Sequence, residues 1–208
     1  MLKTIVGIFL LFVLVMFPDV SRASELPWQL RINEDGITVN TRRVEASPIL
    51  EYQGSVTVDA PLARVVSFYE DEKLMPSWYY QCVRSELVER ENAESQIFYF
   101  VVHLPWPVSE RDSVFRRIKS VDQTTGEVTY SLSALPEKLP IQKGKIRVLY
   151  LRSSWRFTPL KDGRTEIHFQ QHSNPGGSLP AMLVNKLVVD IPYNTLRNLR
   201  KKIMETAK

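Results

Sequence analysis

Apolar and polar residues between positions 37 and 173 form a series of extended segments that are separated by turn signals. Asparagine, aspartate and glycine adopt the backbone angles of tight turns. They mark the boundaries at Glu91-Asn92, Thr125-Gly126, Gly144 and Asp162-Gly163. Such a succession predicts consecutive antiparallel strands. The predicted strands cover residues 37–44, 49–58, 83–90, 95–103, 109–121, 127–133, 145–160 and 165–173.

Two segments before residue 80 have a different pattern. Apolar residues at helical spacing predict a helix of about three turns from Leu62 to near Glu72, with Asp59 as its cap and Pro61 in its first turn. The aromatic segment 73–80 that follows is interrupted by a proline, so we expect it to pack against the sheet or over an opening. A further short helix is expected at residues 25–32.

A long amphipathic helix is predicted from Leu179 to near the end of the chain, with Pro192 inside it as the source of a kink. The segment Ile97–Val102 is apolar at every position, so both of its faces must be covered, one of them by this helix. The predicted fold class is α+β, a curved antiparallel sheet wrapped around one long C-terminal helix. The apolar stripe of this helix consists of Met182, Leu183, Leu187, Val188, Ile191, Leu196, Leu199 and Ile203.

The first 23 residues have the pattern of a signal peptide. Lys3 precedes an apolar run of about 13 residues, and Ser21-Arg22-Ala23 offers small residues for cleavage. We therefore expect a periplasmic or secreted protein, with an uncleaved N-terminal membrane anchor as the alternative. No repeat or linker interrupts the remainder, which predicts one domain over residues 24–208. The single Cys82 allows no disulfide within the chain.

The charge of the chain excludes one class of partner. The formal net charge is +4, and loss of residues 1–23 removes Lys3, Arg22 and Asp19 and so lowers it by one. This excess is too small for nucleic-acid binding without a clustered basic stripe, and the signal-peptide pattern also argues against such a partner, whereas a weak attraction to an anionic membrane surface stays open.

Catalytic and metal-binding motifs are also missing from the sequence. His168 and His172 have the spacing of a metal pair on a helix, but on a strand they stand about 13 Å apart and cannot share one ion directly. No nucleophile elbow, phosphate-binding glycine loop or zinc-protease motif is present. We expect no cofactor, no metal and no catalytic residue.

The segment Leu104–Asp112 reads Leu-Pro-Trp-Pro-Val-Ser-Glu-Arg-Asp and predicts the rim of a pocket. Two prolines stiffen the loop that presents Trp106, and a tryptophan suits a boundary between apolar and wet surroundings. Arg111 and Asp112 then point to opposite faces of a strand, so they cannot both face the interior, and we expect Arg111 to face the pocket with Asp112 pointing away.

Several further motifs resemble the START (StAR-related lipid-transfer) domain family in their order and spacing, over roughly residues 25–205. The resemblance implies a helix-grip fold that encloses one hydrophobic ligand in a tunnel, with the C-terminal helix and nearby loops as the lid. It also implies a monomeric, non-catalytic lipid carrier. The motifs are Pro107 to Asp112, Trp155, Asn174-Pro175-Gly176-Gly177-Ser178-Leu179-Pro180, Asn185, Asp190-Ile191-Pro192 and Leu196 to Arg200.

Some members of that family pair the arginine with an acidic residue on the preceding strand, whereas this chain has only His103 there. The head of the ligand then becomes the expected partner of Arg111, and a structural ion pair or a position at the rim is the alternative. The expected ligand-binding residues are Arg111, His103, Tyr99, Trp155, Phe100, Leu183 and Leu187. The expected rim and lid residues are Trp106, Trp78, Asn174, Gly176, Gly177 and Met182.

Two alternatives to a lipid carrier stay open. Related helix-grip proteins include cyclases that act on a polyketide or aromatic substrate, and a pocket with His103 or Arg111 would suit such an enzyme. A structural module would instead fill its interior with aromatic side chains. Transient membrane contact through Trp106 and the Lys201-Lys202 tail is a further expectation, although such lysines also suit a solvated helix end.

Overall fold

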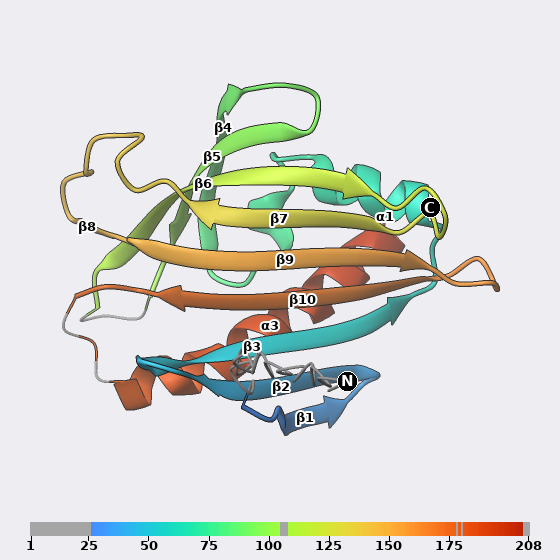
Figure 1. The fold of residues 1–208 in the computed structure, drawn as a ribbon, viewed down its shortest axis with the longest axis horizontal. Helices are drawn as coiled ribbons and strands as arrows, with labels where there is room; N and C mark the ends of the chain where they lie inside the picture. The colour runs from blue at the N-terminus through green and yellow to red at the C-terminus, as the bar shows by residue number, and fades with distance from the viewer. Residues whose placement is uncertain (1–25, 105–107, 178, 180, 206–208) are drawn as a thin grey trace, which may run out of the picture.

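A computed structural model describes residues 26–104, 108–177, 179 and 181–205, without the side chains of residues 181–183. A ten-stranded sheet, antiparallel except where β8 pairs with β6, curves around one long helix, and two short helices lie beside it (Figure 1). In chain order the elements are β1 (Gln29–Glu34), β2 (Ile37–Val44), β3 (Ser47–Val58), α1 (Leu62–Glu70), α2 (Met75–Trp78), β4 (Cys82–Arg90), β5 (Ser95–Val102), β6 (Glu110–Val121), β7 (Val128–Ala134), β8 (Lys145–Arg147), β9 (Tyr150–Pro159), β10 (Thr165–Asn174) and α3 (Ala181–Glu205).

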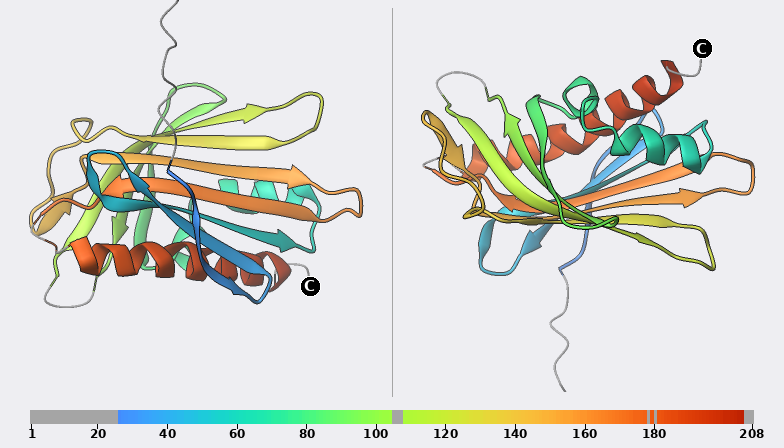
Figure 2. Two further views of the ribbon diagram at one scale, coloured as in Figure 1. Left: turned by 60° about the horizontal axis from the view of Figure 1, so that its bottom comes forward. Right: turned by 90° about the horizontal axis from the view of Figure 1, so that it is seen from above.

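The strands follow the order β1-β2-β3-β10-β9-β7-β6-β5-β4, and β8 pairs with β6 outside this path. Apart from β8, the strands from β4 to β10 pair in sequence order as the predicted antiparallel series, and β10 then joins β3. Helix α3 crosses the concave face (Figure 2). The predicted fold class is confirmed. Within the described part of the chain, none of the helices combines the length and the apolar character needed to cross a membrane.

Three local predictions were wrong. Residues from Gln29 onward form strand β1 and not a helix, because pairing with the edge of β2 satisfies their backbone groups. The predicted strand 145–160 divides into β8 and β9, since its first residues pair with β6 and its later ones with β7 and β10. Asp59 does not cap α1, whose N-cap position is held by Pro61 without a side-chain hydrogen bond.

Both faces of the middle strands are covered. The concave face carries the main core, in which the rings of Trp155 and Phe169 stack with centroids 3.9 Å apart. On the convex face, Tyr99 and three aliphatic residues of β5 and β6 form a second cluster under Leu135 and Leu139. The connection from β7 to β8 therefore provides the second cover that the apolar strand requires.

Helix α3 packs tightly against Gly54 of β3. A Cβ atom there would lie 2.8 Å from Leu196 Cδ1 and 3.3 Å from Pro192 Cβ, so the contact requires glycine. Beyond this contact, Leu199 and Ile203 are fully buried in the core. The half of α3 that precedes Pro192 instead covers a cavity, so the helix has an anchored half and a covering half.

Candidate functional site

An apolar cavity of about 110 Å³ lies between the first half of α3 and the concave face of the sheet. It is found at the end of the sheet where β5 ends, β6 begins and β10 leads into α3 (Figure 2). Gln171, Ser113 and Ser173 add a few polar atoms to a wall that is otherwise apolar. The apolar lining includes Tyr52, Phe100, Val148, Leu151, Leu187 and Ile191.

Among the described residues that line this cavity, Arg111 is the only charged one, and it is 3% exposed. Its guanidinium donates to three backbone carbonyls, those of Ser109 (2.5 Å), Pro175 (3.4 Å) and Gly176 (3.4 Å). None of the carboxylates in the described ranges pairs with it, and burial lowers its pKa. A buried cation whose partners are all neutral carries an uncompensated charge, which an anionic group in the cavity would neutralise.

The turn after β10 brings the backbone against Arg111. Asn174 Oδ1 accepts a hydrogen bond from the Gly176 amide at 3.0 Å, which forms a tight turn. Gly176 and Gly177 both have positive φ, and a Cβ atom at Gly177 would lie 2.9 Å from Ile146 Cδ1 and 3.5 Å from Arg111 Nη2. These two glycines therefore permit the close approach that supplies the carbonyl partners of Arg111.

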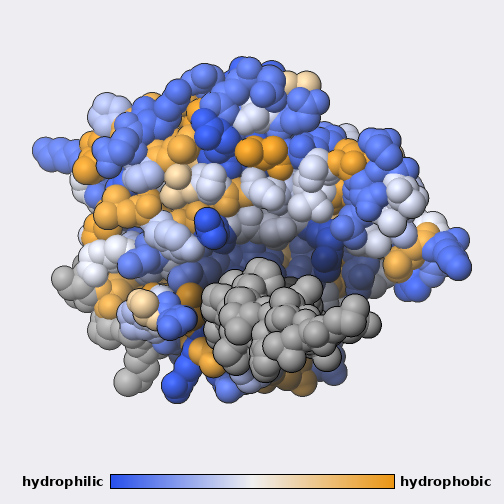
Figure 3. Space-filling view, viewed as in Figure 1, coloured by the Kyte–Doolittle hydropathy of each residue, from blue (hydrophilic) through white to orange (hydrophobic). Residues whose placement is uncertain are grey.

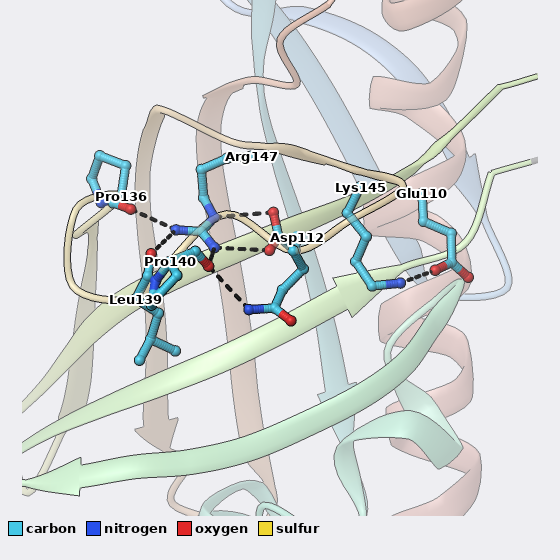
Figure 4. A network of polar contacts seen from close by, with 8 residues as sticks. Glu110, Asp112, Pro136, Leu139, Pro140, Lys145 and Arg147 are labelled. Atoms are coloured by element: carbon cyan, nitrogen blue, oxygen red, sulfur yellow. Dashed lines mark hydrogen bonds and ion pairs between the residues drawn. The ribbon is translucent and has the colours of Figure 1, made fainter.

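Asp112 points to the convex face, where Arg147 binds it with two hydrogen bonds of 2.9 and 3.0 Å (Figure 4). Both side chains are almost completely buried. Arg147 also donates to the carbonyls of Pro136, Leu139 and Pro140, so one guanidinium fastens the β7–β8 connection to β6. The predicted division of Arg111 and Asp112 between the two faces is confirmed.

Three of the predicted ligand-binding residues, Arg111, Phe100 and Leu187, line the cavity. Trp155 lies deeper, beside Trp78, where both line a second void of about 30 Å³. Their contact with a ligand stays a prediction. The side chains of Leu183 and Met182, and Trp106 as a whole, fall outside the described residues.

Three of the predicted site residues, His103, Tyr99 and Trp78, do not lie where the sequence analysis expected them. His103 follows the end of β5 with a side chain that is 61% exposed, and it lies 3.5 Å from Glu110 instead of facing the cavity. Tyr99 alternates with Phe100, so its ring lies in the cluster on the convex face. Trp78 is fully buried at the end of α2 and forms part of the inner wall, not of a lid.

Some cavity residues were missed by the sequence analysis. Tyr52 and Tyr79 contribute ring surface, and burial of both phenols raises their pKa. Gln171 and Ser173 share the face of β10 that begins with Phe169, so the alternation of that strand predicts their direction. No local pattern identifies the tyrosines, because they reach the cavity from two distant segments.

The described residues include no group of three histidine, cysteine, aspartate or glutamate side chains placed to hold a metal ion. Burial lowers the pKa of both His168 and His172. Burial also raises the pKa of the Cys82 thiol to about 12, so this thiol is protonated at neutral pH and is a poor nucleophile.

Sequence comparison identifies relatives over most of the chain. A model of the START domain matches residues 23–207. An uncharacterised protein of Pseudomonas aeruginosa is 36% identical over 173 residues, which cover 83% of this chain and 85% of that protein. The phosphatidylcholine transfer protein of Mus musculus is 30% identical over 181 residues, 84% of this chain and 82% of that protein.

Solved structures are similar as well. A StAR-related lipid transfer protein fragment from Xanthomonas axonopodis has 34% sequence identity and a TM-score of 0.79, covering 85% of this chain and 98% of that one. Human StAR-related lipid transfer protein 5 has a TM-score of 0.80 with 17% identity, covering 87% of this chain and 88% of the other, which is a likeness of fold alone.

Proposed function

This chain belongs to the START domain family, and from that premise we propose that it is a lipid carrier whose ligand has a phosphate or carboxylate in its head group. The lipid occupies the cavity under α3 with its anionic group at Arg111 and its chains against the apolar wall. The observation that carries the proposal is the buried charge of Arg111, which has no carboxylate partner in the described ranges.

The apolar wall suits the tail of such a ligand. Burial of apolar surface stabilises a bound lipid by about 25 cal/mol per Å², so a long chain needs few polar contacts. The carbonyls that already surround the guanidinium fix its position, and the anion completes its set of partners. Phosphatidylcholine, which names the mouse relative, carries a phosphate of this kind.

The size of the cavity implies that α3 moves when lipid enters. Ligand pockets commonly measure roughly 300–1,000 Å³, whereas this cavity measures about 110 Å³. Leu187, Val188 and Ile191 on the first half of α3 form one wall, and the second half is fixed in the core. Displacement of the covering half enlarges the space while the anchored half keeps the fold intact.

Localisation in the cell envelope is part of the same proposal. It is supported by the apolar run and the small residues that end at Ala23. A single bound lipid and a monomeric carrier fit one cavity in one domain. Removal of lipid from a membrane and its delivery elsewhere then require no catalytic residue.

Mass spectrometry of the intact protein purified from its own cells tests the proposal. We expect one lipid that carries a phosphate or a carboxylate, and the mass separates a phospholipid from a fatty acid. Arg111→Gln is expected to lower the occupancy of that lipid at least tenfold, whereas Arg111→Lys retains part of it. Arg164→Gln, at an exposed ion pair with Asp162, is the matched control. Bound lipid that is unchanged in Arg111→Gln would refute the role of Arg111.

A further inference from the structure

The cavity end of the sheet exposes an unusual group of apolar side chains. Ile141 is 72% exposed and Leu149 is 65% exposed, and both belong to the connection between β7 and β9. Tyr150 follows directly and is also exposed. Exposed large apolar side chains are normal when scattered, but two aliphatic residues in one connection followed directly by an exposed tyrosine at the start of β9 indicate a surface that makes contact with a partner.

This group lies beside the cavity. Val148 and Leu151 line the cavity, and Leu149 and Tyr150 lie between them in the chain. Tyr150 also pairs with Asn174 at the end of β10, next to the glycine turn. In Figure 1 the connection forms the left end of the molecule, and Figure 3 shows hydrophobic side chains among hydrophilic ones along that edge.

Two exposed cations lie in sequence close to these apolar residues, and the exposed Glu137 lies nearer the start of the same β7–β8 connection. Lys143 is exposed in the same connection, and Arg152 is exposed on β9 two residues after Tyr150. Neither has an ion-pair partner within the described ranges. Other cations nearby are neutralised, since Arg147 binds Asp112 and Lys145 binds Glu110 (Figure 4). The two unpaired cations therefore give the surface an attraction for anions.

We propose that Ile141, Lys143, Leu149, Tyr150 and Arg152 form a docking patch for an anionic lipid bilayer. The inference rests on the proposed function, because a carrier must bring its cavity to the membrane surface. Apolar and aromatic side chains enter the interfacial region of a bilayer, while lysine and arginine contact anionic head groups. The bidentate ion pair between Asp112 and Arg147 holds the connection rigidly, so the patch is fixed relative to Arg111.

The patch differs from the membrane contact expected from the sequence. Lys201 and Lys202 lie near the C-terminal end of α3, while the cavity lies under its first half. At 1.5 Å per residue the ends of α3 are roughly 36 Å apart. These lysines and the cavity end therefore do not belong to one surface, and both lysines lie close to Glu205.

A local probe tests docking in the full chain. Leu149→Cys is labelled with a dye that reports polarity, because the native Cys82 is buried and its thiol stays protonated. The control is Leu30→Cys, at a residue of β1 that is 59% exposed. Vesicles of phosphatidylcholine with roughly 30% phosphatidylglycerol are expected to shift the emission of the dye at position 149 to the blue, and to leave position 30 unchanged. Equal shifts at both positions, or no shift at 149, overturn the proposal.

Charge variants separate insertion of the apolar side chains from attraction of the cations to anionic head groups. Ile141→Glu combined with Leu149→Glu is expected to weaken vesicle binding about tenfold or more, because two charges must then enter the interface. Lys143→Glu combined with Arg152→Glu is expected to weaken binding to the anionic vesicles and to leave binding to pure phosphatidylcholine unchanged. If neither double variant changes the affinity for vesicles, the proposal is overturned.

Two further measurements test whether the patch instead joins two copies of the chain and whether the protein binds lipid at all. Sedimentation velocity shows whether the patch instead joins two copies of the chain, and a dimer that Leu149→Glu dissociates would overturn membrane docking. Titration with a water-soluble short-chain phospholipid measures lipid binding without a membrane. A short-chain fatty acid is titrated in the same way, and the patch variants are expected to keep whichever binding the unmodified protein has. If the unmodified protein binds neither compound, the proposed function is refuted, while the vesicle measurements still test membrane docking.

Discussion

Arg111 and Asp112 are consecutive residues of β6, and their charges lie on opposite faces of the sheet. Asp112 is neutralised on the convex face by Arg147, whereas Arg111 faces the cavity with only carbonyl partners. A strand alternates the direction of its side chains, so no local rearrangement can pair the two residues with each other. The same dipeptide therefore supplies a structural ion pair and an uncompensated cation in the cavity.

Asp112→Asn is expected to destabilise the protein by about 3–5 kcal/mol, because it leaves the buried charge of Arg147 without a counterion. Denaturant unfolding measures this loss. Asp162→Asn, which breaks an exposed ion pair with Arg164, is the control and should cost far less stability, because solvent screens that pair. Similar losses in the two variants would mean that the buried pair does not fasten the β7–β8 connection to β6.

Asn185→Ala is expected to speed lipid transfer about tenfold. Asn185 lies in the covering half of α3, where its side chain accepts a hydrogen bond from the Leu50 amide at 3.0 Å and donates one to the Pro48 carbonyl at 3.2 Å. Each such bond contributes about 0.5–1.5 kcal/mol, so their loss favours displacement of this half.

Transfer of a fluorescent lipid between vesicles measures the effect of Asn185→Ala. Asn198→Ala, in the anchored half of the same helix, is the control. If Asn185→Ala transfers lipid at the unmodified rate, the two hydrogen bonds do not limit opening of the cavity.

The sequence predicted the fold well because its main signals are local. Turn residues and alternation located the strands of the antiparallel series to within one or two residues at most ends. Helical periodicity located α3, although it does not show that Gly54 lies under Leu196. The errors fall where pairing with a distant segment decides the structure, as in β1 and in the division between β8 and β9.

The site was predicted less completely for the same reason. Alternation along one strand separates Arg111 from Asp112 correctly, and the same rule applied to β5 would have moved Tyr99 to the opposite face from Phe100. It cannot identify Arg147 as the partner of Asp112, because these residues are 35 positions apart and meet only through the parallel pairing of β8 with β6.

Gly54→Ala is expected to destabilise the protein by about 1–3 kcal/mol through overpacking against α3. The added Cβ would lie 2.8 Å from Leu196 Cδ1, and Leu196 is fully buried. Thermal or denaturant unfolding measures the change. Adding Leu196→Val shortens the opposing side chain, so the double variant should lose less stability than the sum of the two single ones. If the two losses in the free energy of unfolding simply add, the side chains at positions 54 and 196 do not clash.

Stability is expected to decrease as the pH falls below about 6.5, in part because of His168 and His172. Burial lowers the pKa of both imidazoles in the folded protein, so the unfolded chain binds more protons in this range. The free energy of unfolding therefore rises with pH between the lowered values and the ordinary value of about 6.5, and it is independent of these two groups above that range.

Replacement of His168 and His172 by glutamine removes both imidazoles whose pKa burial lowers. Denaturant unfolding at a series of pH values between about 5 and 8 measures the slope, which should be shallower in the double variant than in the unmodified protein. His103→Gln is the control, because that side chain is largely exposed and pairs with Glu110 at the surface. A slope that the double variant leaves unchanged, or that His103→Gln flattens equally, would assign the pH dependence to other groups.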